Sequence, residues 1–108
     1  MSSVSTLPVS KAPVSYANAG AVAKALLPDE PVFCFSAKEL RDRSNQFLKR
    51  FPGLVTYAVK CNPSHEVLST LSAVGITHWD VASVHEMASV RKADPDAKFH
   101  YHNPIKSR

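Results

Sequence analysis

The segment Leu54-Val-Thr-Tyr-Ala-Val-Lys60 is an almost continuous apolar run that ends in a lysine. Such a run is typical of a strand that is buried on both faces of a parallel sheet. Strand-like patterns return at Ile76–Ala82 and at Lys98–His102, so the strand starts recur about every 22 residues. This spacing predicts a βαβαβ chain with parallel strands and right-handed crossovers.

Helices are expected before and between these strands. The apolar spacing predicts helices over residues 17–27, 37–51, 64–74 and 84–92. Capping boxes begin the second and fourth of them, at Ser36-x-x-Glu39 and Ser83-x-x-Glu86, and Gly75 suits the left-handed end of the third. Five residues should form the buried face of the second helix: Leu40, Ser44, Phe47, Leu48 and Phe51. Pro31–Phe35 reads as a further short strand.

Length and charge limit the classes of protein. With 108 residues the chain is too short for a complete eight-stranded barrel, and residues 1–30 form a leader with a short helix ahead of a unit over 31–108. The net charge of +4 is spread along the chain without a basic run, which argues against nucleic-acid binding.

No segment could cross a membrane and no signal peptide is evident, so a cytoplasmic protein is expected. Cys34 and Cys61 lack metal-binding spacing, so we expect reduced thiols and no metal.

Lys60 is the first candidate for chemistry. Lys60 is expected at the carboxyl end of the first strand, on the same face as Ala58, because alternate residues of a strand point the same way. Active sites of parallel α/β folds form at the carboxyl ends of strands, and a small residue beside the lysine leaves room for a flat ligand. The alternative is a lysine that extends its amine into solvent.

Asp80 is the second candidate. It shares a face with His78 among apolar neighbours, and a buried carboxylate needs a partner, for which Lys60 on the adjacent strand is available. A purely structural ion pair is the alternative. His100 and His102 share a strand face but have no third metal ligand at useful spacing, so they are expected to be ordinary packing or surface residues.

Three blocks of sequence resemble one enzyme family, in the same order: Tyr57-Ala-Val-Lys-Cys-Asn-Pro63, Asp80-Val-Ala-Ser-Val-His-Glu86 and Tyr101-His-Asn-Pro-Ile-Lys106. They are similar to the ornithine, diaminopimelate and arginine decarboxylases, which share the alanine-racemase-type barrel. The resemblance implies an α/β fold that is the N-terminal part of a pyridoxal-phosphate-binding (β/α)8 TIM barrel, incomplete here with about three βα units. It also implies that Lys60 forms the internal aldimine with pyridoxal phosphate, that Ala58 packs against the cofactor, and that Asp80 is an active-site carboxylate near the lysine.

The second block is closer to the ornithine decarboxylase branch, which implies a decarboxylase of ornithine or a related basic amino acid, acting as a homodimer in polyamine biosynthesis. The resemblance covers Pro31 to Arg108, whereas the family enzymes continue through a full barrel and a β-domain. We therefore expect an N-terminal fragment, a truncated reading frame or one piece of a split enzyme, inactive on its own. The alternatives are a non-catalytic, partner-binding paralogue and a protein that carries pyridoxal phosphate without decarboxylase activity.

Overall fold

The structure is a computed structural model that describes residues 14–104. The expected leader falls largely on residues 1–13, which lie outside the described residues. The chain divides into two units, Met1–Cys34 and Phe35–Arg108, each described by itself here. Within the described part of the chain, no helix is long and apolar enough to cross a membrane.

The described part of the first unit, residues 14–34, contains one helix, α1, over Ala19–Leu26. The Asn18 side chain caps it, accepting a hydrogen bond from the Ala21 amide at 2.9 Å. The strand expected at Pro31–Phe35 is wrong: residues 31–36 have no regular secondary structure. A strand requires a hydrogen-bonded neighbour, and the sheet of the described residues contains no strand from this segment.

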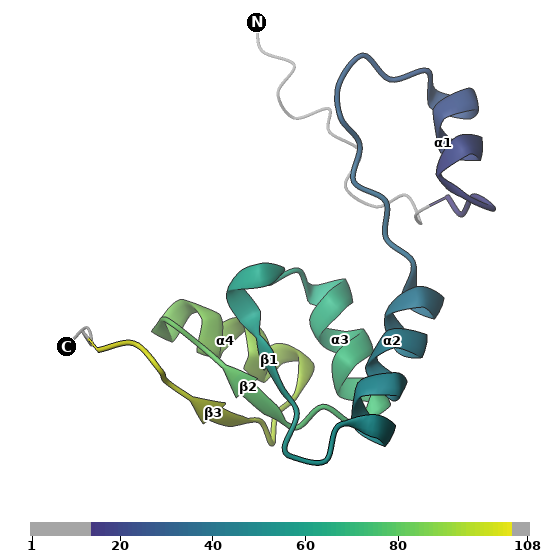
Figure 1. Cartoon of the computed structure of the whole chain (residues 1–108). Helices are drawn as coiled ribbons and strands as arrows, with labels where there is room; N and C mark the ends of the chain where they lie inside the picture. The colour runs from purple at the N-terminus through teal and green to yellow at the C-terminus, as the bar shows by residue number, and fades with distance from the viewer. Residues whose placement is uncertain (1–13, 105–108) are drawn as a thin grey trace, which may run out of the picture. The chain divides into compact units, whose positions relative to one another are not determined.

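The second unit alternates strands and helices (Figure 1). In chain order its elements are α2 (Ala37–Arg50), β1 (Thr56–Ala58), a 3₁₀ helix (Val59–Cys61), α3 (His65–Val74), β2 (His78–Asp80), α4 (Val84–Ala93) and β3 (Lys98–His100). The three strands form a parallel sheet in the order β1-β2-β3, which confirms the predicted βαβαβ order. Each strand has three residues, fewer than the apolar runs suggested.

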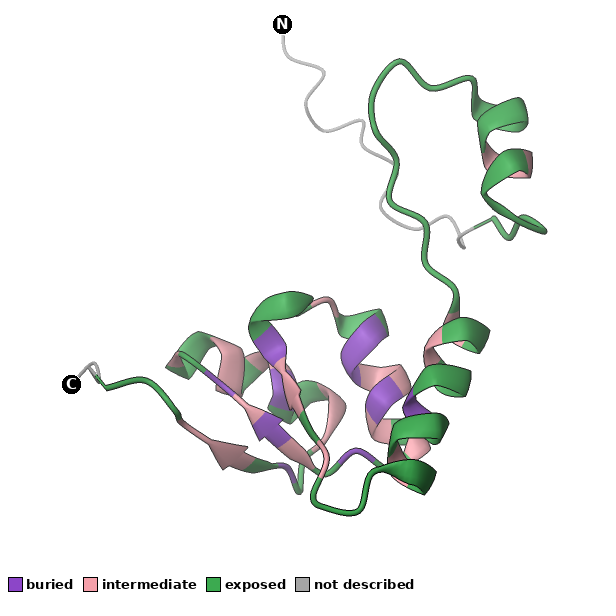
Figure 2. Ribbon diagram, viewed as in Figure 1, coloured by how far each residue is buried: buried purple, intermediate pink, exposed green. Residues whose placement is uncertain are grey.

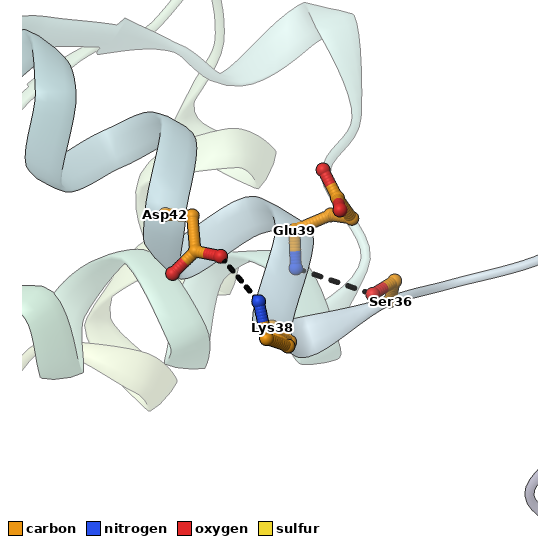
Figure 3. A network of polar contacts seen from close by, with 4 residues as sticks. All are labelled: Ser36, Lys38, Glu39 and Asp42. Atoms are coloured by element: carbon orange, nitrogen blue, oxygen red, sulfur yellow. Dashed lines mark hydrogen bonds and ion pairs between the residues drawn. The ribbon is translucent and has the colours of Figure 1, made fainter. Parts of the chain in front are cut away.

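Local signals in the sequence explain where the helices begin and end. Ser36 and Ser83 accept hydrogen bonds from the amides three residues later, at 3.2 and 3.1 Å, so both predicted caps are confirmed. Figure 3 shows the first cap beside an exposed ion pair of the next turn, in which Lys38 Nζ lies 2.7 Å from Asp42 Oδ2. Gly75 ends α3 with a φ of 112°, the left-handed conformation that favours glycine.

The core lies between the sheet and the helices (Figure 2). Trp79 has no exposed surface, and its ring meets the edge of the half-buried Tyr57 ring at a centroid distance of 6.2 Å. The other buried apolar residues are Val59, Val67, Leu68, Leu71, Ile76, Val81, Val90 and Ala97. Because β1, β2 and β3 follow one another in order, right-handed crossovers place α3 and α4 on the same face of the sheet. Among residues 35–104, no other element covers the opposite face.

Two helical residues expected in the core are exposed. Phe47 is 62% exposed and Phe51 is 53% exposed, so their assignment to the buried face of α2 is wrong. The other three predicted residues are confirmed: Leu40 and Leu48 pack against the core and Ser44 is buried, so they form a row at i, i+4 and i+8 on a helix that contacts α3. Phe47 precedes that row by one residue, which turns it about 100° away around the helix.

Candidate cofactor site

Lys60 lies directly after the carboxyl end of β1, although not in the strand itself. β1 ends at Ala58, and Lys60 is the middle residue of the 3₁₀ helix. The expectation that Ala58 and Lys60 alternate along one strand is therefore wrong, because the backbone leaves the sheet before Lys60. The Lys60 side chain is exposed, whereas Val59 before it is completely buried. The buried neighbour anchors the turn, and the amine remains accessible.

The loop that follows Lys60 is fixed from both sides. The Tyr57 hydroxyl donates a hydrogen bond to the Asn62 carbonyl oxygen at 3.1 Å, and the Asn62 side chain accepts one from the Ser64 amide at 3.0 Å. Burial raises the pKa of Tyr57, and the nearby Cys61 raises it further, so the phenol stays protonated as a donor at neutral pH. Lys60 thus sits in a turn whose two ends are held by the strand and by the start of α3.

A row of three residues crosses the uncovered face of the sheet next to this turn. Ala58 of β1 is in register with Asp80 of β2, which is in register with His100 of β3. Neighbours in register on parallel strands point to the same side, so the three side chains share a face. All three are half-buried. Ala58, two residues before Lys60, contributes only a methyl group to this row.

Asp80 does not form the expected ion pair. Within residues 14–104 the one ion pair is Lys38–Asp42, and no described residue is hydrogen-bonded to the Asp80 carboxylate. The expectation rested on a buried carboxylate, but Asp80 is half-buried and points to the face that no other element of residues 35–104 covers. A half-buried carboxylate is not fully desolvated, so an internal cation is not required. The carboxylate is available to a ligand.

A histidine pair on the same face was missed by the sequence analysis. His78 Nδ1 and His100 Nε2 are 2.8 Å apart, within hydrogen-bond distance. The sequence pattern paired His100 with His102, whose ring is stacked parallel to it at 6.0 Å but is exposed. His78 and His100 are 22 residues apart, which equals the period of the strand–helix repeat. This spacing could have predicted that the two histidines lie on adjacent strands. Among the described residues, no cluster of three or more His, Cys, Asp or Glu could hold a metal ion.

The arrangement defines a class of site: an exposed amine directly after the carboxyl end of a strand in a parallel α/β sheet, with a small residue and a carboxylate in register on the same sheet. Residues 37–108 match the family described as pyridoxal-dependent decarboxylase, pyridoxal binding domain. The chain therefore belongs to the pyridoxal-dependent decarboxylase family, and it comes from the domain that binds pyridoxal phosphate.

A curated relative supports the same conclusion. The chain is 36% identical over 77 residues to a lysine/ornithine decarboxylase of Selenomonas ruminantium, a match that covers 68% of this chain and 19% of that protein. The chain thus spans about one fifth of the length of this relative. No solved structure matches the chain.

The side chains present fit the attachment of pyridoxal phosphate. The cofactor carries an aldehyde, and a primary amine is the protein group that forms a covalent bond with it. Lys60 offers an exposed amine, Ala58 limits the bulk beside it, and Asp80 offers a carboxylate without a protein partner among residues 14–104. Together they can hold the reactive end of the cofactor.

Proposed function

We propose that this chain is the part of a pyridoxal-phosphate-dependent amino-acid decarboxylase that supplies the lysine bonded to the cofactor, and that this lysine is Lys60. The observation that carries the proposal is the position of Lys60, exposed directly after β1 and beside the row formed by Ala58 and Asp80. The family match to a pyridoxal-binding domain supports the identity of the cofactor.

Each residue has a distinct part in this proposal. The Lys60 Nζ must lose its proton to attack the aldehyde carbon of the cofactor, and exposure makes proton exchange with water easy. Ala58 provides a flat surface against which the cofactor ring packs. The Asp80 carboxylate orients the lysine by charge attraction, and the proton that the lysine loses passes to water. These two residues are neighbours in the sheet register, so both act from a rigid support.

When bound, pyridoxal phosphate supplies an electron sink for the negative charge that develops at the substrate α-carbon. In the overall reaction the bond between the α-carbon and the carboxylate breaks, CO₂ leaves, and one proton bonds to the same carbon. The protein must therefore hold the scissile bond in place and supply that proton. Lys60 would hold the cofactor between turnovers and would have to give way to the substrate amine, so its exposed side chain needs freedom to move.

The substrate class is a basic amino acid, with ornithine as the first candidate. It is supported by the relative, which is named a lysine/ornithine decarboxylase, and by the resemblance of the Asp80–Glu86 block to the ornithine branch. The resemblance also implies a homodimer and a role in polyamine biosynthesis, and the proposal includes both. It also includes a location in the cytoplasm.

The test is release of CO₂ from labelled ornithine, lysine and arginine by the protein that carries this chain, with pyridoxal phosphate added. We expect release from ornithine, and a loss of at least about 10³-fold in the Lys60→Arg variant, because both cofactor attachment and proton transfer are removed. Lys49→Arg, on the exposed side of α2, is the matched control and should retain activity.

Two results would contradict parts of the proposal. Full activity in Lys60→Arg would overturn the assignment of the lysine. Attachment of the cofactor at Lys60 without CO₂ release from any amino acid would favour a protein that carries pyridoxal phosphate without decarboxylase activity.

A further inference from the structure

The proposed reaction consumes one proton in each turnover, because a carbon–carboxylate bond is replaced by a carbon–hydrogen bond. We propose that the hydrogen-bonded pair of His78 and His100 is the store of this proton and relays it to the site at Asp80. This inference rests on the proposed function and assigns it a proton source.

The position of the pair supports this role. His100 is in register with Asp80, and Asp80 is in register with Ala58, so the row that begins beside the cofactor lysine ends at an imidazole. His78 lies two residues before Asp80 on the same face of β2. Adjacent strands of a sheet are about 4.8 Å apart, so His100 and Asp80 are direct neighbours.

The bond between the rings makes the pair a relay. One nitrogen of the pair donates a proton and the other accepts it, at a separation of 2.8 Å. If a proton enters at His78 Nε2, the shared proton moves across to His100 Nε2, and His100 can release a proton from Nδ1. The total charge of the pair is unchanged, and the two rings exchange donor and acceptor roles. A proton thus passes from His78 to His100 without either ring moving, and the last transfer, from His100 Nδ1 to the neighbouring Asp80 carboxylate, requires a bridging water or a turn of the side chain.

The charges on this face favour transfer towards Asp80. The carboxylate of Asp80 is in register with His100, and the ammonium of Lys98 is in register with His78. An extra proton is therefore attracted to the His100 end and repelled from the His78 end. The exposed ring of His102 stacks on the other side chain of this end, His100, at a centroid distance of 6.0 Å. Helices α3 and α4 lie on the other face, so within residues 35–104 no further charged group faces the pair from a packed element.

The test separates proton transfer from structure by choosing side chains of matched shape. His100→Gln keeps a hydrogen-bonding group near the position of Nε2 but cannot carry the extra proton, and His78→Asn does the same for Nδ1. His85→Gln, exposed on α4, is the matched control. All variants are made in the protein that carries this chain, loaded with pyridoxal phosphate, and kcat and KM for ornithine are measured. Cofactor attachment at Lys60 is quantified by borohydride reduction and peptide mass mapping.

We expect His100→Gln and His78→Asn to lower kcat at least tenfold, with KM within about twofold and with normal labelling of Lys60. Added imidazole should restore kcat in His100→Ala, which a purely structural role of the ring would not allow. His85→Gln should match the wild type.

An unchanged kcat in His100→Gln with normal labelling of Lys60 would overturn the relay while leaving the proposed function intact. A loss of kcat that imidazole does not restore in His100→Ala would also overturn it, because the ring would then be structural. Failure to label Lys60 in the unmodified protein would overturn the proposed function and the relay together. As a further measurement, ¹⁵N NMR compares the wild-type protein with its His100→Gln variant. The Nδ1 resonance of His78 should differ between the two proteins. An unshifted resonance would show that the two rings are not bonded.

Discussion

The hydrogen bond between Trp79 and Asp94 allows a quantitative test of how the core supports β2. The indole Nε1–H of the fully buried Trp79 donates to Asp94 Oδ2 at 3.0 Å. Asp94 follows α4, and its Oδ1 accepts a hydrogen bond from the Asp96 amide at 3.1 Å. One carboxylate therefore joins the strand that carries Asp80 to the turn between α4 and β3.

Replacing Asp94 by alanine should leave the buried indole N–H without a partner, which costs about 1–3 kcal/mol of unfolding free energy. Loss of the bond to the exposed Asp96 amide adds about 0.5–1 kcal/mol. In a Trp79→Phe background there is no indole donor to orphan, so Asp94→Ala should cost only the second amount. The two substitutions should therefore be coupled by about 1–3 kcal/mol.

Urea denaturation followed by far-ultraviolet circular dichroism measures all four proteins of this cycle. Asp96→Ala is the matched control: it removes a nearby exposed carboxylate for which no contact is known within residues 14–104, and it should change the unfolding free energy by less than about 0.5 kcal/mol. A coupling energy below about 0.5 kcal/mol between Trp79 and Asp94 would refute the reasoning, because the buried indole would then not depend on the carboxylate.

Four further substitutions test the end of α3, the surface of α2 and the loop after β1. Gly75→Ala should destabilise the chain by about 1–2 kcal/mol in urea denaturation, since the added methyl has room 3.9 Å from Leu48 Cδ1 and the cost is the left-handed backbone; an unchanged midpoint would contradict it. Phe47→Ser should leave the unfolding free energy within about 0.5 kcal/mol, whereas Leu48→Ala should lower it by about 2 kcal/mol; equal effects would contradict the observed face of α2. Burial raises the pKa of Tyr57 above 10.0, so protonated Tyr57 contributes to the free energy of unfolding below pH 10. This contribution, measured against Tyr57→Phe by denaturation at several pH values, should fall as the pH rises through the pKa of the folded state.

The order of elements was predictable because the strand–helix period is long and regular. Cap residues such as Ser36, Ser83 and Gly75 act within a few residues, so local sequence determines where those helices begin or end. The face of α2 was harder to predict. Phe47 and Leu48 are adjacent and both apolar, and only the packing of α2 on α3 decides which of them is covered.

In the candidate site, too, the residues could be predicted from the sequence but their geometry could not. Its residues were identified because the three sequence blocks place Ala58, Lys60 and Asp80 near strand ends. Their geometry depended on where β1 stops, and the apolar run through Val59 hides that point, since Val59 is equally buried in a strand or in a 3₁₀ turn. The His78–His100 contact forms across two strands, so it depends on sheet register rather than on a local motif.

The most direct test of the account is the identity of the lysine that bonds pyridoxal phosphate. The protein that carries this chain is incubated with the cofactor, reduced with borohydride, digested and mapped by mass spectrometry. The account predicts that the pyridoxyl label lies on Lys60. A label on Lys49, Lys92 or Lys98 in its place would contradict the assignment of the site.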